Sequence, residues 1–172
     1  MTKDQSRILT WRLGLLGLPL LFYAAGLNPY FQPHTYDNVD YYHGAISIAE
    51  EGVYHQRLAK WPPVFPGVLA FLFVIFGPSM WLAKGLVLVC TGGSLLLAFR
   101  LCQIEDRSPA LLIALLFALL PTGFLMGTAI MSEWPYLFLT LLFLNLLHGL
   151  KKQRGRVQYV LVLGVLLGII AL

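Results

Sequence analysis

The chain alternates between long apolar runs and short polar segments, which is the pattern of a helical membrane protein. The apolar runs cover residues 8–27, 81–99, 109–126, 133–150 and 157–172. A helix needs about 20 apolar residues to cross a bilayer, and it satisfies its backbone hydrogen bonds within one segment. We therefore predict an all-α fold, a polytopic bundle of transmembrane helices. The last run is short for a crossing, so we expect the chain to be the N-terminal part of a longer protein.

Residues 28–80 break this pattern and are predicted to form a loop that carries two interfacial helices. Asp37 caps the first helix and Gly52 ends it. Its apolar positions form one stripe suited to lying on the membrane, made of Val39, Tyr42, Ile46 and Ala49. The second helix, 64–76, is apolar throughout but covers only about 20 Å of a hydrocarbon core about 30 Å thick. It is therefore expected to be interfacial or re-entrant, ending at Gly77-Pro78.

The distribution of Lys and Arg predicts which helix ends face the cytoplasm. If 64–76 does not cross and the N-terminus is inside, nine of the 12 basic residues are cytoplasmic. They are Lys3, Arg7, Arg12, Arg100, Arg107, Lys151, Lys152, Arg154 and Arg156. If 64–76 does cross, six of them move outside, against the positive-inside rule. We expect an integral protein of the plasma (inner) membrane with a cytoplasmic N-terminus and an extracytoplasmic loop 28–80.

The composition supports this class. The chain is 58% hydrophobic and 12% charged, whereas a soluble domain is about a quarter charged. Most of the basic residues behind the net charge of +4 lie beside apolar runs, so nucleic acid is not an expected partner. Ala24-Ala25-Gly26 also fits a signal-peptidase site, so a cleaved signal peptide is the alternative to an uncleaved first helix. Cys90 and Cys102 would lie about 18 Å apart on one helix, too far for a disulfide.

Three carboxylates are candidate site residues: Asp37, Asp40 and Glu133. In the predicted topology they share the extracytoplasmic face, although Glu133 is far from the other two in sequence. A structural role is open to each, because acids stabilise the first turn of a helix and Ser132 can cap the helix that Glu133 begins. However, a charge at the bilayer centre costs roughly 2.5–3.5 kcal/mol or more. Glu133 must therefore lie at the boundary or face a wet cavity, which makes it a site candidate.

Basic residues follow the first interfacial helix, at His55, Arg57 and Lys60. Contact with lipid headgroups is one role for them. The other is a phosphate site, since cations beside carboxylates suit an anionic phospholipid leaving group next to a general base. Lys84 lies inside the span 81–99, and we expect its side chain to snorkel outward.

The order of residues along the loop, and at the start of a later helix, is also informative. The residues are Asp37, Tyr41, Ala45, Glu51-Gly52, Tyr54, Pro62-Pro63, Pro66 and Phe76-Gly77, followed by Glu133 and Pro135. This order resembles the N-terminal part of polytopic glycosyltransferases of the GT-C type. The likeness is to the branch of protein O-mannosyltransferases and lipid A aminoarabinose transferases, and it covers roughly residues 8–150.

The resemblance implies transfer of a sugar from a polyprenyl-phosphate carrier to an extracytoplasmic lipid, glycan or protein acceptor, with inversion. It implies that Asp37 is the general base and that Glu133 is the second acid. Many relatives carry Asp-Glu at the loop position, whereas Asn38 follows Asp37 here, so Asp40 is the alternative base. Some GT-C enzymes use a divalent metal, and Asp37, Asp40 and Glu133 can offer oxygen ligands to Mg²⁺ or Mn²⁺.

A second hypothesis is not enzymatic: a small membrane protein or transporter fragment in which the acids only cap helices. A transporter places its ionisable groups near the middle of the bilayer. Apart from Lys84, the charges here cluster at helix ends, which argues against transport.

Overall fold

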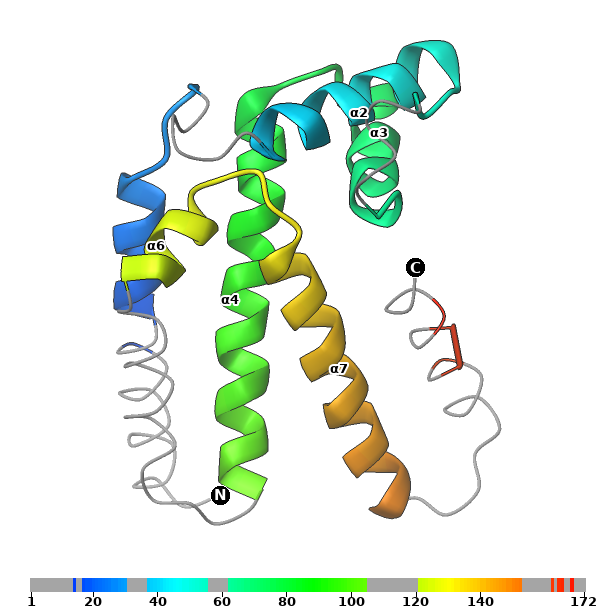
Figure 1. Cartoon of the computed structure of the whole chain (residues 1–172). Helices are drawn as coiled ribbons and strands as arrows, with labels where there is room; N and C mark the ends of the chain where they lie inside the picture. The colour runs from blue at the N-terminus through cyan, green and yellow to red at the C-terminus, as the bar shows by residue number, and fades with distance from the viewer. Residues whose placement is uncertain are drawn as a thin grey trace.

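The computed structural model describes residues 14, 17–30, 37–55, 62–104, 121–152, 162, 164–165 and 168. Within these ranges the regular elements are α-helices (Figure 1). A helical segment covers residues 17–25. It is followed by α2 (Asp37–Glu51), α3 (Val64–Phe76), α4 (Met80–Ile104), α6 (Pro121–Gly127) and α7 (Glu133–Lys152). The predicted all-α fold is therefore confirmed over the described residues.

The central helix is α4, and it contains the predicted span 81–99. It has 25 residues and is about 37 Å long. Among the described residues, only its stretch Met80–Cys102 is both long and apolar enough to cross a membrane. The helix α7 has 20 residues and covers the predicted span 133–150, but Asn145 and His148 make it less apolar. Of the predicted span 8–27, residues 14 and 17–27 are described, whereas the predicted spans 109–126 and 157–172 lie largely outside the described residues.

A pair of glycines in α4 lets two other helices approach closely. Helices α4 and α7 run in the same direction and pack against each other (Figure 1). A Cβ atom at Gly93 would lie 2.5 Å from a ring carbon of Phe138 in α7. A Cβ atom at Gly92 would lie 3.2 Å from Leu20 of the segment 17–25. Small residues at such contacts are typical of helices that pack within membranes.

Asn145 adds a polar contact between α4 and α7. Its Nδ2 donates to the Leu97 carbonyl of α4 over 3.2 Å and to the Leu141 carbonyl of its own helix over 2.8 Å. Its Oδ1 is buried and accepts no hydrogen bond. The amide therefore links the two helices at the cost of one unsatisfied acceptor.

The two loop helices share a hydrophobic core with the starts of α4 and α7. The ring of Tyr41 in α2 lies 5.2 Å from that of Phe65 in α3, and the ring of Tyr42 lies 5.3 Å from that of Phe73. The buried cluster comprises Tyr41, Ala45, Phe65, Leu69, Ala70, Phe73, Ala83, Val87, Cys90, Ile130 and Trp134. Through this cluster, α2 and α3 are fixed to one end of α4.

Glycines end both loop helices, as the sequence predicts. Gly52 has φ 69° and donates its N–H to the Ile48 carbonyl over 3.1 Å. Gly77 has φ 82° and donates to the Phe73 carbonyl over 2.8 Å. A residue with a Cβ atom rarely adopts a positive φ, so both positions favour glycine. The observed bounds of α3 are those predicted.

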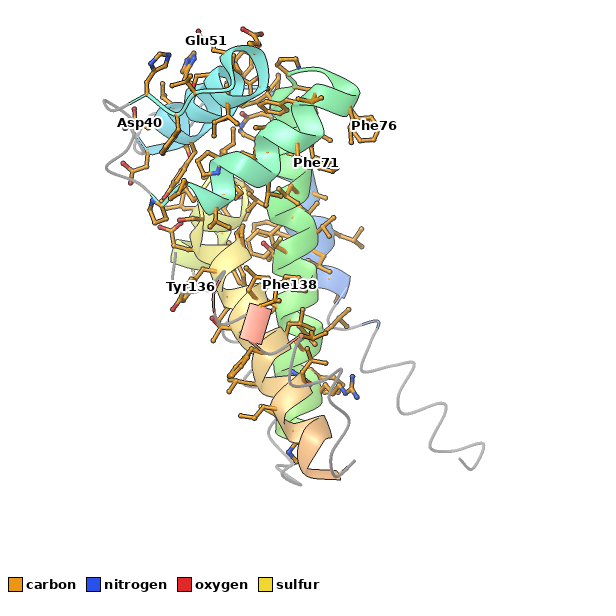
Figure 2. The ribbon with its side chains drawn as sticks, turned by 90° about the vertical axis from the view of Figure 1, so that its right-hand side faces the viewer. Asp40, Glu51, Phe71, Phe76, Tyr136 and Phe138 are labelled. Carbon is orange, nitrogen blue, oxygen red and sulfur yellow. The ribbon has the colours of Figure 1, made fainter. Side chains whose placement is uncertain are left out.

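The apolar stripe of α2 differs from the prediction. Of its members, Tyr42, Ile46 and Ala49 pack against the core, and Val39 is exposed. The stripe is largely covered because α3 supplies an apolar surface beside it. The outward apolar face belongs instead to α3, on the side away from α2, where Phe71 and Phe76 project (Figure 2).

The prediction that Lys84 snorkels outward is wrong. Its side chain is only 1% exposed. Its Nζ donates to the Tyr30 carbonyl over 2.6 Å and to Asn28 Oδ1 over 3.2 Å. Residues 28–30 thus lie over the start of α4, and their neutral oxygen atoms offset part of the cost of burying the cation.

Candidate functional site

The first turns of α2 hold Asp37, Asp40 and Tyr41. Asp37 is the first residue of α2, and Asp40 lies in its first turn. Tyr41 follows Asp37 by one turn and so lies on the same side of the helix. The Tyr41 side chain is 3% exposed, whereas both acids are partly exposed. The helix therefore buries an aromatic ring in the core directly beside acids that reach its surface.

The start of α7 places Ser132 and Glu133 at the same end of α4. The N–H of Tyr136 donates to the Ser132 carbonyl over 2.8 Å, which begins the helix directly after Ser132. Trp134 is buried, and its Nε1 donates to the Gly123 carbonyl of α6 over 3.4 Å. Glu133, between these two anchored residues, is exposed.

One hydrogen bond joins the starts of α2 and α7. Tyr41 Oη and Ser132 Oγ lie 2.8 Å apart, and either hydroxyl can donate. The two residues are 91 positions apart in sequence. Ser132 precedes the first residue of α7, as predicted for a cap, but its hydroxyl bonds to α2. The contact brings the segment that carries Asp37 to the segment that carries Glu133.

The pKa of the Tyr41 hydroxyl depends on both Asp37 and Glu133. Burial raises the pKa of the Tyr41 hydroxyl, and the hydrogen bond with Ser132 lowers it. The negative charges of Glu133 and Asp37 raise this pKa further. Both carboxylates are therefore close enough to influence one hydroxyl. Tyr41 is neutral at physiological pH.

Asp40 acts on a different residue. Burial raises the pKa of the Tyr54 hydroxyl, with smaller increases from Tyr41 and from the charge of Asp40. The Tyr54 ring packs on α2, where a Cβ atom at Gly44 would lie 2.8 Å from it. Asp37 thus shares a neighbour with Glu133, whereas the charge of Asp40 acts on Tyr54. This arrangement favours Asp37 over Asp40 as the partner of Glu133.

Within the described part of the chain, the predicted phosphate-binding residues do not lie where the starts of α2 and α7 meet. His55 Nε2 lies 2.7 Å from Glu51 Oε2, and both side chains are more than half exposed. Glu51 is the last residue of α2, about 21 Å along the helix axis from Asp37. Arg57 and Lys60 lie outside the described residues.

The described side chains do not form a metal site. Among them, no three His, Cys, Asp or Glu residues converge closely enough to hold an ion. Asp37, Asp40 and Glu133 are therefore not gathered as a set of three ligands for one ion.

The sequence identified the acids but not the contact that joins their helices. Tyr41 was notable only for its spacing from Asp37, and Ser132 only as a cap. Each is a hydroxyl residue beside a candidate acid, and that is the one local signal that marks them. Their pairing depends on how α2 and α7 pack, which no local pattern encodes.

Comparison with protein-family models, curated proteins and solved structures finds no match.

Proposed function

We propose that the protein is an integral membrane glycosyltransferase that moves a sugar from a polyprenyl-phosphate carrier to an extracytoplasmic acceptor. One observation carries the proposal: the starts of α2 and α7 meet at one end of the apolar helix α4, where Asp37 and Glu133 both act on Tyr41. Ionisable groups next to a membrane segment are candidates for function when they face one another or a wet cavity. A donor held in lipid and an acceptor in water would meet at such a boundary.

The proposal includes a topology. The protein is polytopic, its N-terminus is cytoplasmic, and α2, α3 and the start of α7 lie on the extracytoplasmic side. Support comes from the positive-inside count and from the shared direction of α4 and α7, which places the starts of both helices toward α2.

The proposed reaction is a single displacement at the anomeric carbon. The acceptor hydroxyl attacks this carbon, the bond from the carbon to the phosphate oxygen breaks, and configuration inverts. The acceptor proton passes to Asp37, the general base. Polyprenyl phosphate leaves as an anion, so one base suffices, whereas glycoside hydrolysis uses a carboxylate pair. Glu133 accepts a hydrogen bond from the bound sugar or acceptor and orients it.

The leaving phosphate requires positive charge nearby. A cation fixed at the site stabilises the charge that develops on the phosphate. Arg57 and Lys60, which follow α2, are the proposed residues for this role. His55 is the weaker candidate because its side chain bonds to Glu51.

The alternative, in which the acids only cap helices, also has an observation in its favour. Asp37 and Asp40 lie in the first turn of α2, and Glu133 is the first residue of α7. Acids at these positions stabilise a helix through its dipole, by about 0.3–1 kcal/mol each. The two functions differ in whether loss of one carboxylate abolishes turnover or only lowers stability.

A transfer assay separates them. The intact gene product, reconstituted in nanodiscs, would be supplied with a panel of polyprenyl-phosphate sugars and acceptors. We expect transfer by the wild-type protein and none by Asp37→Asn. Glu50→Gln is the matched control, because Glu50 is exposed and lies near the opposite end of the same helix from Asp37. An Asp37→Asn protein that transfers sugar at the wild-type rate would contradict the base assignment.

A further inference from the structure

Asp37 and Glu133 are like charges that the fold brings near each other. The charge of Asp37 acts on Glu133, and both charges act on the Tyr41 hydroxyl. Like charges repel, and the repulsion is stronger where water is partly excluded. A hydrogen bond between the two helix starts opposes this repulsion and adds to the hydrophobic core that they share.

This hydrogen bond, between Tyr41 and Ser132, lies beside the two acids. Tyr41 is one helical turn from Asp37, and Ser132 directly precedes Glu133. The bond is between neutral hydroxyls, so it adds no charge to the pair.

Both partners of this bond are held by their surroundings. The Tyr41 ring is buried and packs edge-on against Phe65. Ser132 is followed by the anchored Trp134, whose indole contacts the Tyr23 ring edge-on at 6.4 Å. A bond between two immobilised groups fixes a distance, whereas one between mobile side chains would adapt to whatever distance the helices adopt.

We propose that Tyr41 and Ser132 are positioning residues, whose hydrogen bond sets the separation of Asp37 and Glu133 so that both carboxylates face one bound sugar and its acceptor. The inference rests on the proposed glycosyltransferase function. Neither hydroxyl takes part in the bond changes. Each acts through the acid beside it.

Steady-state kinetics of variants in nanodiscs test this role. We expect Ser132→Ala and Tyr41→Phe each to lower kcat about tenfold or more, because displaced catalytic groups lose rate steeply. KM for the donor should stay close to the wild-type value. The double variant should be no slower than the slower single variant, since both remove the same bond. Ser132→Thr keeps a hydroxyl and should recover most of kcat.

A purely structural role gives a different pattern. It predicts less folded protein with a normal kcat per folded molecule, and that result overturns the inference. Losses of kcat that add in the double variant would show that the two hydroxyls act independently, and they would overturn it as well. The inference is also overturned if the wild-type protein transfers sugar and Ser132→Ala has a kcat within about twofold of it. In that case the proposed function still stands. A wild-type protein that transfers no sugar from any donor contradicts the proposed function itself. If Tyr41→Phe does not fold, Ser132→Ala tests the same bond from a partly exposed side chain.

Discussion

The helix α7 makes two contacts of opposite character. Along its length it packs on α4, where Phe138 lies against Gly93. At its start it meets α2 through the hydroxyls of Tyr41 and Ser132, beside the two acids. The first contact is close-packed and mostly apolar, whereas the second includes a hydrogen bond between neutral hydroxyls beside two like charges. The difference indicates that the α4–α7 contact supports the fold, whereas the α2–α7 contact holds two like charges near each other at some expense of stability.

The largest effect is expected from filling the space at Gly93. Gly93→Leu should lower the free energy of unfolding by about 3 kcal/mol, because the new side chain would overlap the Phe138 ring and push α7 from α4. Titration with SDS in mixed micelles measures this. The control is Gly85→Ala in the same helix, where an added Cβ meets nothing within 4 Å. It should stabilise by up to about 1 kcal/mol through helix propensity. If Gly93→Leu is as stable as wild type, the contact is not close-packed.

A smaller loss is expected at the α2–α7 contact. Tyr41→Phe removes one hydrogen bond and should lower stability by about 1 kcal/mol, measured by the same titration. Tyr136→Phe is the matched control, because the Tyr136 side chain is exposed and lies on the side of α7 away from Phe138 (Figure 2). Its stability should equal that of wild type. A loss at Tyr136→Phe as large as that at Tyr41→Phe would remove the distinction between the two contacts.

Asn145 is expected to give a small change of opposite sign. Asn145→Leu loses the bond to the Leu97 carbonyl, worth about 0.6 kcal/mol on average in membranes. It also removes a buried Oδ1 that accepts no hydrogen bond, which relieves about 1 kcal/mol or more. Stability should therefore rise by roughly 0.5 kcal/mol. A fall of more than 1 kcal/mol in the SDS titration would show that the amide is the main link between α4 and α7.

The smallest expected effect is a change in the pKa of Tyr41. Glu133→Gln should lower this pKa, because it removes a negative charge that raises it, and Ser132→Ala should raise it, because it removes a bond that lowers it. The shifts are followed by NMR of ring-labelled tyrosine in micelles, with Tyr41→Phe to assign the signal. If the Tyr41 pKa shifted in the same direction in both variants, the observed arrangement of Tyr41, Ser132 and Glu133 would be contradicted.

The same pKa has a consequence for stability. Burial and the acids raise the pKa of Tyr41 above its ordinary value of 10.0. Its contribution to stability is therefore fully present below pH 10 and is lost as pH rises through the raised pKa.

Local patterns predicted the features of the fold that depend on neighbours in sequence. The bounds of α3 followed from its apolar run, and its end followed from Gly77, which needs a positive φ. The start of α4 followed in the same way from its apolar run, although the helix continues past the predicted end at Arg100 to Ile104. These features are encoded within a few residues, so the sequence alone was enough.

Features that depend on contacts between distant segments were not predicted from the sequence. Lys84 is satisfied by Asn28 and Tyr30, which are 56 and 54 positions away. The acids were predicted to share one end of the helices because topology fixes the ends. The Tyr41–Ser132 bond was not predicted, because it depends on the orientation of α2 relative to α3 and of α7 relative to α4.

The shared direction of α4 and α7 has a consequence for how the protein is made. The chain leaves α4 at one end and re-enters the described structure in α6 at the other (Figure 1). A ribosome adding about 5–20 residues per second needs roughly 2–10 s to deliver α7 after α4 is complete. During that interval Gly93 of the nascent α4 is not covered by Phe138. The close contact between Gly93 and Phe138 therefore forms several seconds after α4 itself is complete.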